Sequence, residues 1–217
     1  MGAESRLAEL CGHLAWLHSY PKGAFIYQQG EISNRFYQLV SGRVRLFLGN
    51  NEGREHVLAI VEPGGLFGEA ACFDGLPYHA TTVTVQPSTV RVFPRETMLE
   101  AMRAQPNVTL EVLRSITRKQ RLFALQLESA MFKKAPARVA FILSRLATYY
   151  GAPVAGERAT RVALHLSHEV LASMIGVTRV TVTREIGALI RDGIITRDKR
   201  HLIVRHHERL LERAQLS

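Results

Sequence analysis

Cysteine is scarce in this 217-residue chain, which contains only Cys11 and Cys72. Two cysteines this far apart supply neither a disulfide framework nor a cluster of metal ligands, which is typical of a protein from the reducing cytosol. No apolar run is long enough to cross a bilayer, and the N-terminus, MGAESRLAEL, lacks the basic-then-apolar pattern of a signal peptide. We therefore expect a cytoplasmic protein that does not contact membranes.

Catalytic signatures are missing as well. The sequence has no HExxH pattern, no phosphate-binding glycine loop, and no convincing nucleophile–base pair or pair of acids. We therefore expect no enzymatic activity. The hydrophobic content of 47% is ample for a packed core, and the length fits one large or two modest domains.

Positive charge is concentrated near the C-terminus. Residues 133–217 contain 15 Lys and Arg against 7 Asp and Glu, a net charge of +8, whereas residues 1–132 have a net charge of +1. A basic segment joined to a nearly neutral one is the electrostatic pattern of a nucleic-acid reader with a separate sensor. A merely solvated basic surface would not explain this segregation.

The basic segment contains LSHEVLASMIGVTRVTVTREIGALIR, residues 166–191, which predicts two short helices joined by a tight turn. Ser167 and Thr178 are the expected N-caps, and Gly176 lies where a left-handed C-cap is required. On the second helix, Val182, Ile186 and Leu189 share one face, and Arg179, Val180, Thr183 and Arg184 share another. The pattern favours a helix-turn-helix over an ordinary amphipathic hairpin.

The first part of the chain is predicted to be mostly β. Leu7, Leu10, Leu14 and Leu17 have helical spacing and predict a short helical segment within residues 1–19. Short apolar runs separated by glycine, proline or asparagine then favour an antiparallel sandwich or roll. These runs are residues 24–27, 35–40, 43–48, 56–61, 81–85 and 89–93.

A long helix is predicted from Asn107 to about Phe132, after Pro106 and a short helix over residues 94–102. Its apolar positions alternate steps of three and four, which is typical of a coiled-coil seam. One long helix packed on its own domain is the alternative, but a second apolar face favours a two-fold dimer helix. The seam consists of Leu113, Ile116, Gln120, Phe123, Leu127 and Ala130.

The remaining segments complete an α+β chain. Residues 133–136 predict a hinge, residues 137–149 a helix and residues 151–156 a loop. A strand over 162–166 precedes the helical pair, and residues 193–204 form a hairpin or wing beside it, followed by a helix over 207–215. We expect a β-roll sensor domain over 1–105, a dimerisation helix over 106–133 and a winged helix-turn-helix domain over 134–217.

This order of parts resembles the cyclic-AMP receptor protein / fumarate-nitrate regulator (CRP/FNR) family of bacterial transcription factors along nearly the whole chain. The matching motifs are SGRVRLF (41–47), PGGLFGEAACFDG (63–75) and GVTRVTVTREI (176–186). The run TRVTVTR is also similar to the nitrogen-control regulators of cyanobacteria. The resemblance implies a cyclic-nucleotide-binding-like jelly roll and a homodimer that binds two-fold symmetric double-stranded DNA, with RNA polymerase as a further partner.

The family pattern also implies roles for the recognition residues. Arg179 and Arg184 match positions that read guanine, where a guanidinium can donate two hydrogen bonds to O6 and N7. Val180 replaces a glutamate that accepts from cytosine, so we expect apolar contact there instead. Thr178 and Thr183 are candidates for phosphate contacts. Lys199 and Arg200 in the wing are expected to add unspecific phosphate contacts.

The sensor pocket departs from the family pattern for cyclic AMP. Gly68 and Glu69 match the pair that holds the ribose, but His79-Ala80 stands where an Arg-Ser pair would hold the phosphate. Phe123-Ala124 replaces the Thr-Ser pair that reads adenine. A phosphodiester would lack its bidentate cationic partner, so we expect an effector other than cyclic AMP, or none. Glu69 is then expected to cap backbone amides of the roll.

Other family effectors stay open. Two cysteines cannot supply the four thiolates of an iron–sulfur cluster. A haem could use Cys72, His56 or His79, although a buried cysteine is usually a small hydrophobe. A small organic acid could use His79, Arg91 or Lys119 as counter-charges. The cofactor is therefore unknown from the sequence, as are the operator and whether the protein activates or represses.

Overall fold

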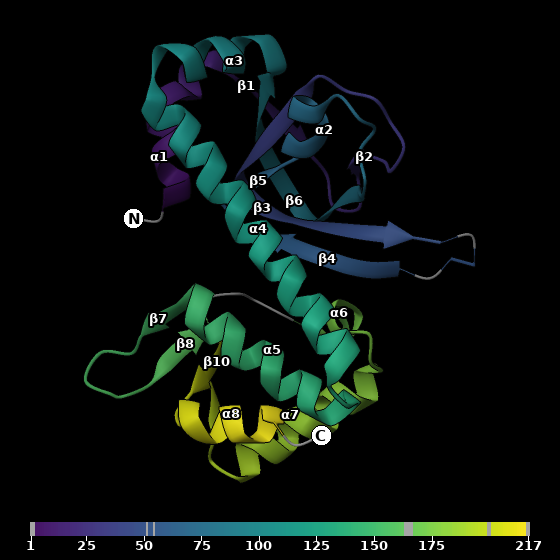
Figure 1. Cartoon of the computed structure of the whole chain (residues 1–217), viewed down its shortest axis with the longest axis vertical. Coiled ribbons are helices and arrows are strands. Elements are labelled where there is room, and N and C mark those ends of the chain that lie inside the picture. Colours follow the sequence, from purple (N-terminus) through teal and green to yellow (C-terminus); the bar gives the residue numbers. More distant parts are fainter. Residues whose placement is uncertain (1–2, 51, 54, 163–166, 199–200, 216–217) are drawn as a thin grey trace. The chain divides into compact units, whose positions relative to one another are not determined.

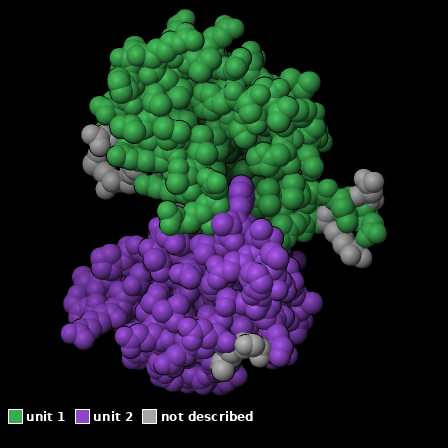
Figure 2. Space-filling model, viewed as in Figure 1, with its two compact units in different colours: residues 1–121 green, residues 122–217 purple. Residues whose placement is uncertain are grey.

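The computed structural model describes residues 3–50, 52–53, 55–162, 167–198 and 201–215. The chain divides into two compact units, Met1–Arg121 and Leu122–Ser217 (Figure 2). The boundary falls inside the long helix α4 (Pro106–Phe132), so each unit includes one part of that helix. The division into a sensor domain (1–105), a dimerisation helix (106–133) and a DNA-binding domain (134–217) stays a prediction.

The first unit is built on one antiparallel sheet in the order β1-β6-β3-β4, with β2 paired to β6 and β5 paired to β3 (Figure 1). The predicted roll is therefore confirmed. Its strands are β1 (Trp16–Tyr20), β2 (Phe25–Tyr27), β3 (Arg35–Gly49), β4 (Glu55–Val61), β5 (Leu66–Phe67) and β6 (Thr81–Pro94).

Two of the predicted strand breaks are wrong. The chain runs through Ser41-Gly42 within β3 and through Pro87 within β6, with irregular register between Leu39 and Val44. Gly42 has a φ of 94°, and a Cβ there would lie 2.3 Å from the Ser88 hydroxyl oxygen. That hydroxyl accepts a hydrogen bond from the Arg43 amide at 3.1 Å. The turn-forming residues thus make a bulge between paired strands rather than a loop.

The prediction of a helical segment reaching residue 19 is also only partly right. Helix α1 (Ala3–Cys11) and the short 3-10 helix η1 (Gly12–Leu14) end before Trp16. Residues Trp16–Tyr20 pair with β6, with Trp16 opposite Val92 and Tyr20 opposite Ser88. The helical spacing of Leu17 is therefore accidental, because strand pairing decides the conformation there.

Four helical segments of the first unit share one hydrophobic core with the sheet. They are α1, α2 (Glu69–Asp74), α3 (Arg95–Ala104) and the first part of α4. The core between them includes both cysteines, which are fully buried. Burial raises the pKa of each thiol to about 11, so both cysteines are protonated, inert core residues at neutral pH. The other members of this core are Leu7, Phe36, Leu66, Phe93, Met98, Ala101, Val108 and Val112.

The second unit continues with α5 (Ala135–Tyr150), which buries Val139, Ile142, Leu143 and Leu146. Its sheet has the order β7-β8-β10-β9. The segment predicted as a loop over 151–156 begins with a strand, because β7 (Gly151–Pro153) pairs with β8 (Thr160–Val162). Residues 163–166 of the predicted strand lie outside the described residues. The remaining elements are α6 (His168–Ile175), α7 (Arg179–Arg191), β9 (Ile195–Asp198), β10 (His201–Val204) and α8 (His207–Gln215).

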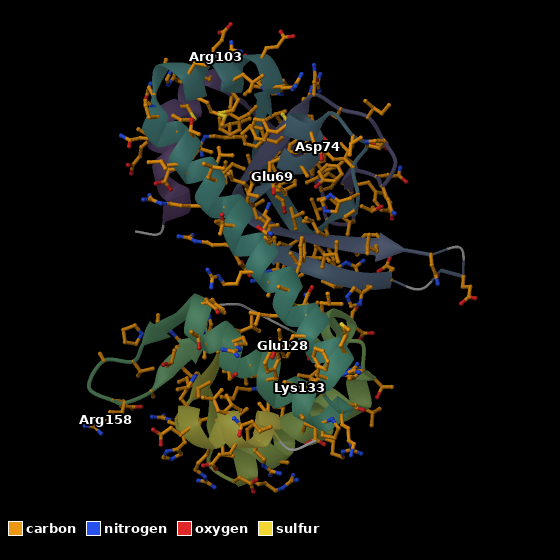
Figure 3. The ribbon with its side chains drawn as sticks, in the orientation of Figure 1. Glu69, Asp74, Arg103, Glu128, Lys133 and Arg158 are labelled. Carbon is orange, nitrogen blue, oxygen red and sulfur yellow. The ribbon has the colours of Figure 1, made fainter. Side chains whose placement is uncertain are left out.

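The predicted hinge is two residues long, since α4 ends at Phe132 and α5 begins at Ala135. Side chains in the second unit fix this junction. The Lys133 ammonium group (labelled in Figure 3) donates to the Ala214 carbonyl at 3.0 Å and lies 4.8 Å from the centre of the Phe141 ring. The Arg138 guanidinium donates to the carbonyls of Ala130 and Lys133 at 2.9 and 2.8 Å.

Candidate DNA-reading surface and sensor pocket

The helix-turn-helix forms as its sequence predicts. The Ser167 hydroxyl accepts from the Val170 amide at 3.2 Å and caps α6, and Gly176 ends that helix in the left-handed conformation, with φ 63°. The Thr178 hydroxyl accepts from the Thr181 amide at 3.1 Å and caps α7. These caps satisfy backbone amides at both helix starts and fix the turn between the helices.

Helix α7 has one buried face and one exposed face. Val182, Ile186 and Leu189 are almost fully buried and fix the helix in the unit. A second face, displaced by about a third of a turn, exposes Arg179, Val180, Thr183 and Arg184, and Val180 is 73% exposed although it is apolar. The Arg184 guanidinium contacts the neighbouring Glu185 carboxylate at 3.0 Å. The structure thus brings together on one open surface the four residues that the sequence placed there.

The wing is the hairpin of β9 and β10, in which Arg197 lies opposite Leu202. This agrees with the predicted hairpin. Its tip residues Lys199 and Arg200, which we expect to contact phosphates, lie outside the described residues.

One polar link joins the three parts of this surface, and sequence reasoning missed it. His168, in the first turn of α6, has its Nδ1 2.8 Å from the Thr183 hydroxyl on α7 and its Nε2 2.9 Å from an Arg197 guanidinium nitrogen on β9. Burial lowers the pKa of His168, and the charges of Arg197 and Arg179 lower it further. His168 is therefore neutral at pH 7. No spacing rule connects residues this far apart in sequence.

The expected dimer seam on α4 leaves large apolar groups exposed. Leu113 is 51% exposed and Leu127 is 61% exposed, while Ile116 and Phe123 are partly buried. The polar position Gln120 and the last seam position Ala130 are also exposed. Leu113 and Leu127 are thus the large apolar side chains of the expected seam that are open to contact with another surface.

The first unit contains Glu69 in an arrangement that the sequence did not predict. Glu69 is buried at the start of α2 (labelled in Figure 3), and the Lys119 ammonium group on α4 lies 2.7 and 2.8 Å from its two carboxylate oxygens. Burial alone would raise the pKa of Glu69, but Lys119 outweighs it through charge and hydrogen bonding and lowers the pKa. A hydrogen bond from the backbone amide of Glu69 itself lowers the pKa further, so the ion pair adds to the backbone contact expected of this carboxylate.

Aromatic side chains surround Gly68, which precedes Glu69. The rings of Tyr27 and Tyr78 stack with centroids 3.7 Å apart, and Tyr37 stacks on Phe67 at 5.2 Å. Gly68 has a φ of 79°, and a Cβ there would lie 3.2 Å from each of the three tyrosine rings. The roll's own side chains therefore fill the space beside the residue expected to approach a ribose.

The other expected pocket residues are spread over both units. In the first unit, Ala80 is buried and His79 is exposed. The proposed counter-charges have partners of their own, since Lys119 pairs with Glu69 and Arg91 donates to the Gln38 side chain at 3.3 Å. Phe123 and Ala124 lie in the second unit, and their part in a pocket stays an expectation.

Comparison with protein families gives two matches that together span most of the chain. Residues 17–105 match the cyclic nucleotide-binding domain, and residues 137–213 match the Crp-like helix-turn-helix domain. The cyclic AMP receptor protein of Thermus thermophilus is 32% identical over 176 residues, which cover 81% of this chain and 77% of that protein. The chain belongs to the CRP/FNR family of transcription regulators.

Further similarities agree with this assignment. The CRP-like cAMP-activated global transcriptional regulator of Mycobacterium tuberculosis is 29% identical over 196 residues, or 90% of this chain and 87% of that one. A solved structure of a CooA mutant from Carboxydothermus hydrogenoformans aligns with a TM-score of 0.79 at 24% identity, covering 94% of this chain and 89% of the other. The latter supports the fold of this CRP/FNR regulator, a β domain, a long helix and a helix-turn-helix domain.

Within the described ranges, no group of three or more His, Cys, Asp or Glu side chains is placed to hold a metal ion, and no helix is long and apolar enough to span a membrane. The haem ligands considered from the sequence lie in different environments in this CRP/FNR chain. Cys72 is a buried thiol with a raised pKa, whereas haem coordination by cysteine requires a thiolate. His79 is exposed, and His56 is partly buried with a pKa that burial lowers.

Proposed function

We propose that this CRP/FNR regulator reads a two-fold symmetric DNA site with the exposed face of α7, as a homodimer. The observation that carries the proposal is the division of α7 into a buried apolar face and an exposed face bearing Arg179 and Arg184. A helix fixed by its own core can present side chains to a major groove without rearrangement. Relatives are transcription regulators, and we infer no enzymatic role for the chain.

Each exposed residue has a proposed role that follows from its chemistry. Arg179 and Arg184 donate bidentate hydrogen bonds to guanine O6 and N7, for which Arg184 has to turn away from Glu185. Val180 makes apolar contact with a thymine methyl. Thr178 and Thr183 donate to phosphate oxygens, and Lys199 and Arg200 add salt-dependent phosphate contacts.

Dimerisation through α4 would double this surface. The proposed contact is the row of seam residues, of which Leu113 and Leu127 are the most exposed apolar members. Two copies related by a two-fold axis would bury these side chains against each other and present two α7 helices to successive major grooves. We also propose that the dimer acts in the cytoplasm and contacts RNA polymerase, as a regulator of this family.

The experiment is a selection of duplexes from a random pool, followed by titrations with the selected site and single base-pair variants. Arg179→Ala should weaken binding by about 1–3 kcal/mol for the selected site and remove discrimination at one base position. Lys199→Ala should weaken binding to all duplexes and lower the slope of affinity against salt concentration instead. Equal behaviour of the two variants would contradict the proposed division into base and backbone contacts.

For the sensor we propose an effector other than cyclic AMP, or control without one. Three observations support this proposal. Glu69 forms an ion pair with Lys119, and three tyrosine rings fill the space beside Gly68. His79-Ala80 stands where an Arg-Ser pair would hold the phosphate of a cyclic nucleotide. A cyclic-nucleotide effector is the second candidate, favoured by the match of residues 17–105 and by the relatives named for cyclic AMP. Calorimetric titration with cyclic AMP and cyclic GMP decides between them, and the absorbance spectrum of the protein purified from its own cells tests for haem.

A further inference from the structure

The hydrogen-bond roles of His168 are determined by its two partners. A guanidinium group can only donate, so Nε2 of His168 must accept from Arg197 across the 2.9 Å contact. The neutral ring then carries its proton on Nδ1 and donates it to the Thr183 hydroxyl at 2.8 Å. The hydrogen bond accepted at Nε2 therefore fixes the tautomer in which Nδ1 carries the proton and can donate.

This arrangement leaves the Thr183 hydroxyl proton available. Once the hydroxyl oxygen has accepted from His168, its own proton can be donated outward, and no other hydrogen bond to this side chain is found in the described part of the chain. Thr183 lies on the exposed face of α7, and Arg197 is exposed on the wing. One imidazole ring thus orients a donor on the recognition helix and a cation on the wing.

We propose that His168 is a positioning residue for DNA recognition, which aims the Thr183 hydroxyl and the Arg197 guanidinium at phosphate oxygens of the same duplex. The inference rests on the proposed DNA-reading role of α7 and deepens it. The hydrogen-bond network fixes the angle between recognition helix and wing at the contact surface, so that phosphate contacts set the register in which Arg179 and Arg184 meet the bases.

Protonation of His168 would break this hydrogen-bond network. The imidazolium has no lone pair to accept from Arg197, and it adds a cation next to Arg197 on β9 and Arg179 on α7, with Glu169 beside it on its own helix. General attraction to DNA would rise with the added charge, whereas the orientation required for the specific site would be lost. Specificity, rather than affinity alone, is therefore the informative quantity.

The test measures the ratio of affinities for the selected site and for a scrambled duplex, from about pH 7.5 to about pH 5.5 at constant salt. For the wild-type protein the ratio should fall on acidification. His168→Gln retains an acceptor for Arg197 but loses the hydrogen bond to Thr183. His168→Asn retains a donor for Thr183 but loses the hydrogen bond from Arg197. Each variant should therefore lower the ratio at pH 7.5 by about 2- to 12-fold, the value of one hydrogen bond. Both variants should remove the part of the pH dependence that belongs to residue 168. His207→Gln, an exposed histidine in the same unit, is the matched control.

A double-mutant cycle separates positioning from simple loss of stability. Thr183→Val removes the hydroxyl with little change of shape, and its effect on the ratio should not add to that of His168→Gln, because both changes remove the same hydrogen bond between residues 168 and 183. Circular dichroism and urea unfolding show whether each variant folds.

The outcomes are distinct. A ratio that stays constant with pH while affinity for both duplexes rises on acidification would mean that His168 contacts phosphate as a cation, and this would overturn the inference alone. Additive effects of His168→Gln and Thr183→Val would also overturn it. Failure of the wild-type protein to select any sequence would overturn the DNA-reading proposal itself, and the inference with it.

Discussion

The Lys119 ammonium group lies within hydrogen-bond distance of both carboxylate oxygens of Glu69, at 2.7 and 2.8 Å. Glu69 is 7% exposed, so removing its partner leaves a charge that water reaches poorly. We expect Lys119→Ala to lower the free energy of unfolding by about 1–3 kcal/mol. Urea unfolding measures this loss, and Lys22→Ala, at an exposed lysine of the same unit, serves as the control.

The same pair predicts a dependence of stability on pH. Because the pKa of Glu69 is lowered in the folded protein from its ordinary value of 4.5, its ionised form stabilises the fold above that value. This contribution is lost as the pH falls from the ordinary pKa through the lower folded pKa. Glu69→Gln should therefore be less stable than wild type at neutral pH and lose less stability between neutral pH and that acidic range. Parallel stability curves for the two proteins would contradict the assignment.

Gly68 should tolerate no side chain, for two separable reasons. Its backbone has a φ of 79°, and a Cβ would lie 3.2 Å from three tyrosine rings. Gly75 has a similar φ of 76°, but a Cβ there would meet no atom within 4 Å. Both alanine variants should therefore lose about 1 kcal/mol from backbone strain, and Gly68→Ala should lose more. Thermal unfolding compares them, and near-ultraviolet circular dichroism reports whether the tyrosine cluster shifts.

Local signals explain why the helix-turn-helix could be predicted from the sequence. Ser167, Gly176 and Thr178 act on backbone groups within a few residues of themselves, so their chemistry determines the helix ends wherever the chain is placed. The buried face of α7 follows from the helical period alone. The orientation of Arg179 and Arg184 away from the core could be predicted for the same reason.

Long-range pairings explain what the sequence could not predict. The segment from Trp16 is a strand because β6 lies beside it, and the bulge at Gly42 depends on Ser88, which is distant in sequence. The ion pair of Glu69 and Lys119 spans 50 positions. In each case the contacting residue belongs to another helix or strand, so the local sequence pattern cannot predict the contact.

The link through His168 was missed for the same reason. Its two partners lie 15 and 29 positions away, on a helix and a strand whose mutual arrangement is a property of the folded unit. Only the wing's general basic character was visible in the sequence. Functional positions that act through other residues are therefore harder to predict than those that present a charged side chain outward.

The seam on α4 predicts how the dimer can be separated without unfolding the chain. Leu127 is 61% exposed, so Leu127→Glu should cost little stability in a single chain. In a dimer, two carboxylates would face each other across the seam and lose their hydration, so we expect monomers in sedimentation velocity and weak binding to the symmetric DNA site. Leu76→Glu changes a leucine with a similar exposure of 62% outside α4 and should leave the mass and the binding unchanged. A dimer of unchanged mass for Leu127→Glu would contradict the proposed interface.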